Sequence, residues 1–116
     1  MVNLQEQTVY IAGPISKVDW TEAKVKFVDL EGKVRNFKPK HIYNPLDFMA
    51  PPMQMDEMER WSWYMRQAVR CLSLCDAIVL MDNYHISKGA RLEKYLAEEL
   101  GITVYHERDL REVSSE

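Results

Sequence analysis

A glutamate interrupts the apolar face of the last helix that the sequence predicts, at residues 87–100. The apolar positions of that helix repeat at three- and four-residue steps: Ala90, Leu96, Ala97 and Leu100. Position 93 belongs to the same stripe and is Glu. Because a carboxylate on a core-facing stripe costs free energy unless something uses it, Glu93 is a candidate catalytic residue. The alternative is a structural glutamate that reaches solvent or pairs with a lysine.

The first turn of the same helix has the composition of an anion-binding site. Ser87 is the expected N-cap, and the amides of Lys88, Gly89 and Ala90 are expected to point into the crevice at the helix N-terminus. Gly89 would let a ligand approach the backbone. The four glycines lie at positions 13, 32, 89 and 101, a spacing found in neither a P-loop nor a dinucleotide-binding fingerprint. The pattern therefore favours a mononucleotide over NAD.

Strands and helices that can position these residues alternate along the chain. The expected strands are residues 8–12, 41–43, 75–81 and 102–105, and the expected helices are 20–36, 56–74 and 87–100. Residues 25–28 are an alternative strand. The order βαβαβαβ predicts the α/β class, with a small doubly wound, flavodoxin-like or Rossmann-like parallel sheet of about four strands. We expect the strand order 2-1-3-4, helices on both faces, and a ligand between strands 1 and 3, where loops 13–17 and 82–87 meet.

Two of the helices carry apolar faces that predict the core. The stripe of helix 20–36 is Ala23, Phe27, Leu30, Val34 and Phe37, and that of helix 56–74 is Met58, Trp61, Met65, Ala68, Val69 and Leu72. Five of the seven methionines fall in residues 49–65. They predict either irregular packing filled by flexible side chains or an adaptable lid or subunit contact.

The composition is that of a globular protein. The 116 residues include 15 basic and 18 acidic side chains, for a net charge of −3, and 47% are hydrophobic. These values predict one domain over residues 1–116, with a core at about 8–107 and a charged tail at 108–116 that frays or forms a short helix. The acidic balance argues against a partner that is a polymeric nucleic acid. No apolar run is long enough for a membrane span, and the N-terminus lacks a signal-peptide pattern, so we expect a cytoplasmic protein with no membrane partner.

Metal binding is not expected. The chain has two cysteines, Cys71 and Cys75, and its three histidines are scattered. A zinc site would want more cysteines, or histidines at ligand spacing. The two thiols are expected to pack against apolar partners.

Four segments occur together in an order that resembles a known family. They are VYIAGPI at 9–15, NP at 44–45, CDAI at 75–78 and SKGARLE at 87–93. Over about residues 9–107 the chain resembles a family of small bacterial and phage proteins, described as a domain of unknown function, within the nucleoside 2-deoxyribosyltransferase-like superfamily. The first and last segments are the most specific for that group.

The resemblance implies a chemistry for the carboxylate. Glu93 matches the glutamate that attacks C1′ of a 2-deoxynucleoside and displaces the base, forming a deoxyribosyl-enzyme ester that passes to another base or to water. Tyr10 matches the tyrosine that holds this nucleophile, although a packed strand aromatic is its structural alternative. Ser87 matches the serine that contacts phosphate in relatives acting on 5′-monophosphates. With Gly89 and Ala90, and with Gly13 and Asp82 at the ends of strands 1 and 3, it forms the expected substrate-binding set.

One position departs from the family pattern. Relatives carry an Asp-Leu pair on the preceding helix, and its aspartate helps the base to leave; the matching pair here is Ala68-Val69. General acid assistance is typically worth ~10²–10⁴-fold in rate. Asp82 or Asp47 could take over, and nothing in the sequence selects between them. A slow enzyme, or none, is therefore one of the alternatives.

Three functions follow as hypotheses. The first is cleavage or transfer at the N-glycosidic bond of a 2-deoxynucleoside or its 5′-monophosphate, with no metal or organic cofactor because the nucleophile is a side chain. The second is a nucleotide-binding module that has lost catalysis and senses or sequesters a nucleotide. The third is an assembly domain that uses residues 53–65, where Trp61, Trp63 and Tyr64 predict an exposed aromatic patch. The resemblance also implies a homo-oligomer, a dimer or a hexamer, in which neighbouring subunits close the site.

Overall fold

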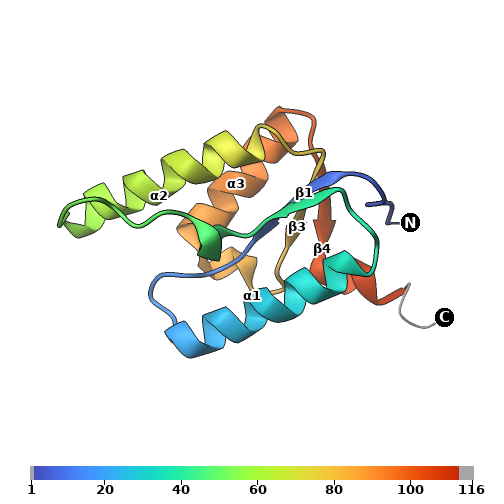
Figure 1. Cartoon of the computed structure of the whole chain (residues 1–116), viewed down its shortest axis with the longest axis horizontal. Coiled ribbons are helices and arrows are strands. Elements are labelled where there is room, and N and C mark those ends of the chain that lie inside the picture. Colours follow the sequence, from blue (N-terminus) through green and yellow to red (C-terminus); the bar gives the residue numbers. More distant parts are fainter. Residues whose placement is uncertain (1, 113–116) are drawn as a thin grey trace.

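The four strands form one parallel sheet. In the computed structural model, which describes residues 2–112, strands and helices alternate as predicted. The strands are β1 (Thr8–Ala12), β2 (His41–Tyr43), β3 (Ala77–Leu80) and β4 (Thr103–His106). All pairings are parallel and the spatial order is β2-β1-β3-β4 (Figure 1). The predicted fold class and the order 2-1-3-4 are therefore confirmed, and the two central strands are β1 and β3.

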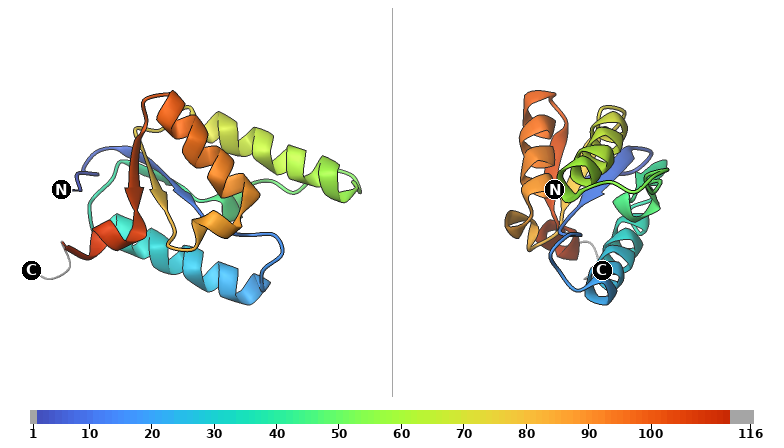
Figure 2. Two further views of the ribbon diagram at one scale, coloured as in Figure 1. Left: turned by 180° about the vertical axis from the view of Figure 1, so that it is seen from behind. Right: turned by 90° about the vertical axis from the view of Figure 1, so that its left-hand side faces the viewer.

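Three α-helices cover the two faces of this sheet. They are α1 (Trp20–Arg35), α2 (Glu57–Leu72) and α3 (Lys88–Glu99), and each begins at a residue whose side chain accepts a backbone amide of the first turn. These caps are Asp19, Asp56 and Ser87, and Asp56 forms a full capping box with Glu59. Figure 2 shows α1 on one side of the sheet and α2 with α3 on the other. Residues 25–28 lie inside α1, so the alternative strand is wrong.

The core divides at the sheet because successive strand side chains point to opposite faces. Toward α1 the buried cluster contains Leu4, Val9, Ile11, Phe27, Leu30, Val34, Ala77, Val79, Met81 and Leu110. Toward α2 and α3 it contains Tyr10, Ala12, Ala68, Leu72, Cys75, Ile78, Leu80, Ala90 and Ala97. The stripe predicted for α1 is buried as expected, with Phe37 half-buried just beyond the helix.

Some residues predicted for the apolar stripes are exposed. Met58 is 79% exposed because the first turns of α2 project beyond the sheet (Figure 1), and Val69 also faces solvent. Leu100 is exposed because α3 ends at Glu99 and the chain turns there into Gly101, which has a positive φ of 74°.

The predicted exposed aromatic patch on α2 is not observed. Trp61, Trp63 and Tyr64 are all half-buried. The indole of Trp63 donates to the carbonyl of Met49 at 2.9 Å, and the ring of Trp61 lies under the ammonium group of Lys88. The segment before α2 therefore contacts Trp63, and the start of α3 contacts Trp61.

The end of the described chain forms a short helix, one of the two expectations for the predicted tail. Residues Glu107–Glu112 form a 3₁₀ helix, and Leu110 is buried beside α1. The carboxylate of Glu107 accepts from Lys33 at 3.0 Å and from the backbone amide of Asp82 at 3.1 Å. The core thus extends beyond the predicted limit at 107; residues 113–116 of the predicted tail lie outside the described part.

Candidate active site

The carboxylate of Glu93 lies inside the protein, bonded to a tyrosine of the sheet. Glu93 is in the second turn of α3 and only 6% exposed, which confirms its predicted place on the core-facing stripe. Its Oε2 accepts a hydrogen bond from the hydroxyl of Tyr10, which is in the middle of β1 and fully buried. Two candidate residues that are 83 positions apart in sequence are therefore in direct contact.

Burial governs the ionisation of both groups. It raises the pKa of Glu93 from 4.5 to about 7, although the hydrogen bond from Tyr10 acts in the opposite direction. The pKa of Tyr10 is also well above its ordinary value, first because of burial and then because of the neighbouring Glu93 carboxylate. Tyr10 therefore keeps its proton at neutral pH and donates it in a hydrogen bond, while Glu93 titrates close to neutrality.

Apolar side chains and two thiols, Cys71 and Cys75, lie near Tyr10. Ala68 of α2 is 3% exposed and belongs to the same buried cluster as Tyr10. Position 68, where the resemblance leads us to expect an aspartate, therefore lies on the same side of the sheet as Tyr10. The ring of Phe48 lies 6.4 Å, centroid to centroid, from that of Tyr10. Asp47 and Asp82, the two predicted substitutes for the acid, are both exposed.

Ser87 caps α3 as predicted, but the predicted anion site is partly used by the protein itself. The hydroxyl of Ser87 accepts the amide of Ala90 at 3.1 Å, so that amide is not directed at a ligand. A Cβ built on Gly89 would lie 3.2 Å from Sδ of Met65, so this glycine allows α2 to pack closely against α3. The ammonium group of Lys88 lies 4.3 Å from the ring centre of Trp61, so a positive charge is present near the N-terminus of α3.

The other two predicted binding residues lie at the carboxyl ends of β1 and β3. Gly13 is buried, and a Cβ there would lie 2.7 Å from Sδ of Met81, so close packing between the strand ends requires a glycine. Asp82 is exposed and uses its backbone amide to bind Glu107. The loops that follow β1 and β3 do flank the switch point of the sheet, as expected.

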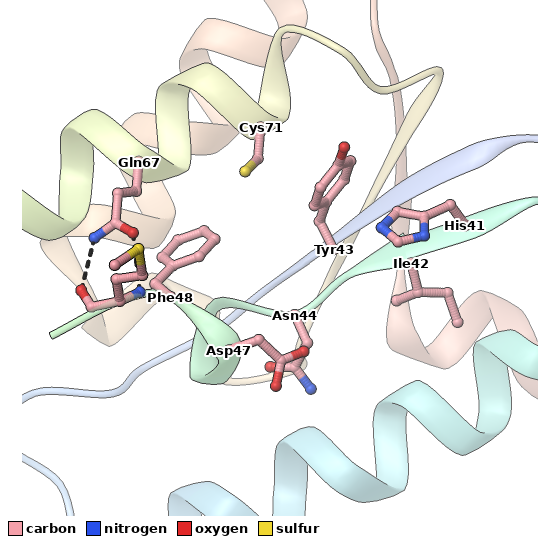
Figure 3. Close-up of a pocket in the computed structure, with 9 residues that line it drawn as sticks. His41, Ile42, Tyr43, Asn44, Asp47, Phe48, Gln67 and Cys71 are labelled. Atoms are coloured by element: carbon pink, nitrogen blue, oxygen red, sulfur yellow. Dashed lines mark hydrogen bonds between the residues drawn. The ribbon is translucent and has the colours of Figure 1, made fainter.

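A cavity of about 340 Å³ opens between β2 and α2. Figure 3 shows the rings of Tyr43 and Phe48 directed toward the helix that carries Gln67 and Cys71. The amide of Gln67 accepts from the backbone N–H of Met49 and donates to its carbonyl, both at 3.0 Å. Neither Glu93 nor Tyr10 lines this cavity, and Phe48 lies between it and Tyr10. The Gln67–Met49 clamp, the two hydrogen bonds between these residues, therefore holds the backbone next to Phe48, whose ring lies beside that of Tyr10.

The contributions of Phe48 and Gln67 were missed in the sequence. Phe48 lies in a proline-containing segment with no helical or strand periodicity, so no pattern indicated which way its ring points. Gln67 comes directly before Ala68, the position where relatives carry an aspartate. That departure from the family pattern was the one signal in the sequence that drew attention to this turn of α2.

The described residues contain no set of three His, Cys, Asp or Glu side chains that converges as metal ligands. Cys71 and Cys75 are both free thiols, and Cys75 donates to the carbonyl of Cys71 at 3.3 Å. Within residues 2–112 no helix has the length and apolar character needed to cross a membrane.

Comparisons with known proteins agree with this architecture. The family described as Domain of unknown function (DUF4406) matches residues 7–106. Among curated proteins no match was found. Among solved structures, the chain is similar to a 2-deoxyribosyltransferase from Bacillus psychrosaccharolyticus, with a TM-score of 0.63 and 18% identity over 85% of this chain and 70% of that one. The resemblance noted in the sequence is thereby confirmed at the level of family and fold.

Proposed function

This chain belongs to the DUF4406 family and has the fold of a 2-deoxyribosyltransferase, and from that premise we propose that it acts on the N-glycosidic bond of a 2-deoxynucleoside 5′-monophosphate. The reaction is transfer of the deoxyribosyl group to another base or to water. The observation that carries the proposal is the buried Glu93 carboxylate with the Tyr10 hydroxyl bonded to it. Burying this group in its ionised form costs free energy at neutral pH and above, so a chemical role is the better explanation of Glu93.

The hydrogen bond determines which oxygen attacks. Because Oε2 of Glu93 accepts from Tyr10, Oε1 is the nucleophile. Oε1 forms a bond to C1′ while the C1′–N bond breaks and its electron pair leaves with the base, through a transition state of oxocarbenium character. A water oxygen or a nitrogen of an acceptor base then attacks C1′, and the C1′–O bond of the ester breaks, which regenerates the carboxylate. The proton that the attacking water or base loses goes to solvent or to the departed base. Tyr10 orients the carboxylate and stabilises its anionic form before the attack and again as the ester breaks.

The departing base needs a proton that Glu93, as nucleophile, does not supply. The side chain at position 68 is a methyl group, and the surrounding cluster is apolar. The base therefore leaves unprotonated or takes its proton from Asp47, Asp82 or solvent. This predicts slow turnover and a preference for bases that are good leaving groups.

The phosphate is proposed to bind at the N-terminus of α3. Ser87, the helix dipole and Lys88 provide a hydroxyl, a partial positive charge and a full one in the same turn. In a phosphate complex, Ser87 would exchange its bond to Ala90 for one to a phosphate oxygen, and Gly89 leaves the backbone accessible once Met65 moves aside. A 5′-monophosphate is therefore the preferred substrate over the free nucleoside.

Release of free base from 2-deoxynucleosides and their 5′-monophosphates, followed by liquid chromatography, tests the proposal. Glu93→Gln keeps the size of the side chain and removes the nucleophile, so release is expected to fall to background. Glu98→Gln, an exposed position of the same helix, is the matched control and should keep full activity. If Glu93→Gln released base as fast as the unmodified protein, the mechanism would be wrong.

A binding module without catalysis is the second candidate, and Ala68 is the observation that favours it. Such a protein would bind a deoxynucleotide and leave it intact. Calorimetry combined with the product assay separates the two candidates: tight binding with no base release over hours identifies the module. Release that depends on Glu93 identifies the enzyme.

A further inference from the structure

Trp61 of α2 reaches the start of α3 with both its ring face and its ring nitrogen. The ammonium of Lys88 lies 4.3 Å from the centre of the ring. The atom of Trp61 nearest to Gly89 is Nε1, which lies 3.9 Å from the position that a Cβ on this glycine would occupy. Oγ of Ser87 lies at the same distance from that position. The indole N–H edge and the Ser87 hydroxyl therefore flank one point of the α3 backbone that carries no side chain.

Two polar groups at this point have no partner in the described chain. Within residues 2–112 the indole N–H of Trp61 donates to no acceptor, whereas that of Trp63, two residues later, donates to the carbonyl of Met49 at 2.9 Å. Over the same residues the ammonium of Lys88 forms no ion pair. Tryptophan N–H groups that leave solvent usually find an acceptor. A donor and a positive charge are thus available together to an anion from outside the chain.

The spacing of residues on the two helices relates Trp61 to the reacting carboxylate. Gly89 and Glu93 are four residues apart, so they lie on one face of α3, about 6 Å apart along its axis. Trp61, Met65 and Ala68 lie on one face of α2, at steps of four and three residues. The two helices pack side by side (Figure 2), with Trp61 and Met65 at Gly89 and with Ala68 deeper, in the buried cluster against the sheet. Trp61 is therefore at the outer end of this row, one helical turn of α3 away from the level of Glu93.

A nucleotide that reacts at Glu93 would place its phosphate near this point, because C1′ and the 5′-phosphate are on opposite sides of the sugar ring. We propose that Trp61 is a specificity-determining residue of the proposed reaction. Its indole N–H donates to a phosphate oxygen, and its ring holds the ammonium of Lys88 beside the same phosphate. This inference rests on the proposed function. A free nucleoside carries a neutral hydroxyl in place of the phosphate, so it gains nothing from the charge of Lys88.

Substitutions separate the two contributions of the indole. Trp61→Phe keeps an aromatic ring under Lys88 and removes the N–H, so the dissociation constant of a phosphorylated ligand should rise about tenfold. Trp61→Leu removes the ring as well and should raise it about 50-fold. Lys88→Arg keeps the charge and can stack on the ring, so it should retain the affinity, whereas Lys88→Gln should lose it. None of these changes should alter the affinity for the unphosphorylated ligand.

2-Deoxyribose 5-phosphate tests the contact without any reaction, because it has no base to release. It is added to the isotope-labelled full chain, and the indole N–H signals are followed by nuclear magnetic resonance, each assigned from its Trp→Phe variant. The signal of Trp61 is expected to move. Those of Trp20, which is exposed on α1, and of Trp63, which is bonded to Met49, are internal controls and should stay in place. An unmoved Trp61 signal at millimolar sugar phosphate, or an equal movement with 2-deoxyribose, would overturn the proposal.

Calorimetric titration of the same sugar phosphate then ranks the variants. Trp63→Phe is the matched control, since it makes the same substitution on the same helix, and it should bind like the unmodified protein. Trp61→Phe that also binds like the unmodified protein would refute the role of the N–H, and circular dichroism verifies that each variant is folded. The base-release assay with Glu93→Gln tests the reaction separately. Sugar phosphate that binds through Trp61 to a protein that releases no base would refute the proposed reaction and leave the phosphate contact in place.

Discussion

Replacing Glu93 by glutamine should change how the stability of the protein depends on pH. In the folded protein burial raises the pKa of Glu93 to about 7, whereas the same group in the unfolded chain has its ordinary value of 4.5. Between these two pH values the unfolded chain releases the proton and the folded protein retains it. The unfolded state then binds fewer protons, so the free energy of unfolding decreases as pH rises through this window.

The size of the effect follows from the shift. A change in pKa from 4.5 to about 7 corresponds to about 3 kcal/mol of stability, all of it present below pH 4.5 and lost by the time the pH is above 7. Because Glu93 is almost fully buried, solvent screening does not reduce this figure much. Glutamine does not titrate. The free energy of unfolding of Glu93→Gln, minus that of the unmodified protein, should therefore rise by about 3 kcal/mol between pH 4 and pH 8.

Urea denaturation at one-unit steps from pH 4 to pH 8 measures this difference. All other titrating groups are shared by the two proteins, so their contributions cancel. Glu98→Gln serves as the control because it makes the same substitution at an exposed position of the same helix. A difference between Glu93→Gln and the unmodified protein that stays constant over the whole pH range would refute the argument that burial controls this carboxylate.

Three other substitutions test the surroundings of the pair. Gly13→Ala should lower the free energy of unfolding by about 1–3 kcal/mol, because its methyl group would lie 2.7 Å from Sδ of Met81; an unchanged urea midpoint would contradict this. Gln67→Ala removes both side-chain bonds to Met49, so the amides of residues 48–55 should exchange hydrogen several-fold faster by mass spectrometry, and equal protection would show that the clamp does not hold the segment. Ala68→Asp should raise base release ~10²-fold at some cost in stability. A folded variant that is no faster would argue against the missing acid as the cause of slow turnover.

The sheet could be predicted because parallel strands covered on both faces are continuous apolar runs. Residues 77–80 are Ala, Ile, Val and Leu, and all four are buried. An unbroken apolar run of this kind in the sequence indicates a strand covered on both faces. The position of Glu93 was predictable for a related reason, since one charged residue on an apolar stripe stands out. Its contact with Tyr10 followed from the family resemblance and not from any spacing within the chain.

Other features depend on tertiary geometry that no periodic pattern encodes. Whether Met58 is buried depends on how far α2 extends past the sheet. The sequence of the helix does not indicate this, because it does not show where the sheet ends. Phe48 ends a 3₁₀ turn at Pro45–Asp47, and the backbone of the next residue, Met49, is bound by Gln67 of α2. Leu110 looked like part of a charged tail and is buried because α1 leaves an apolar surface beside it.

The order of the strands has a consequence for how the chain folds. β1 is made first during synthesis, yet both of its neighbours come later: Thr8 pairs with His41, and Val9 pairs with Ala77. One edge of β1 therefore stays unpaired until the chain has been made as far as Ala77. No strand pair in this sheet is a local hairpin, so each step of assembly closes a long loop. A folding time of roughly milliseconds to seconds is expected, with the nascent first strand open to pairing with other chains in the meantime.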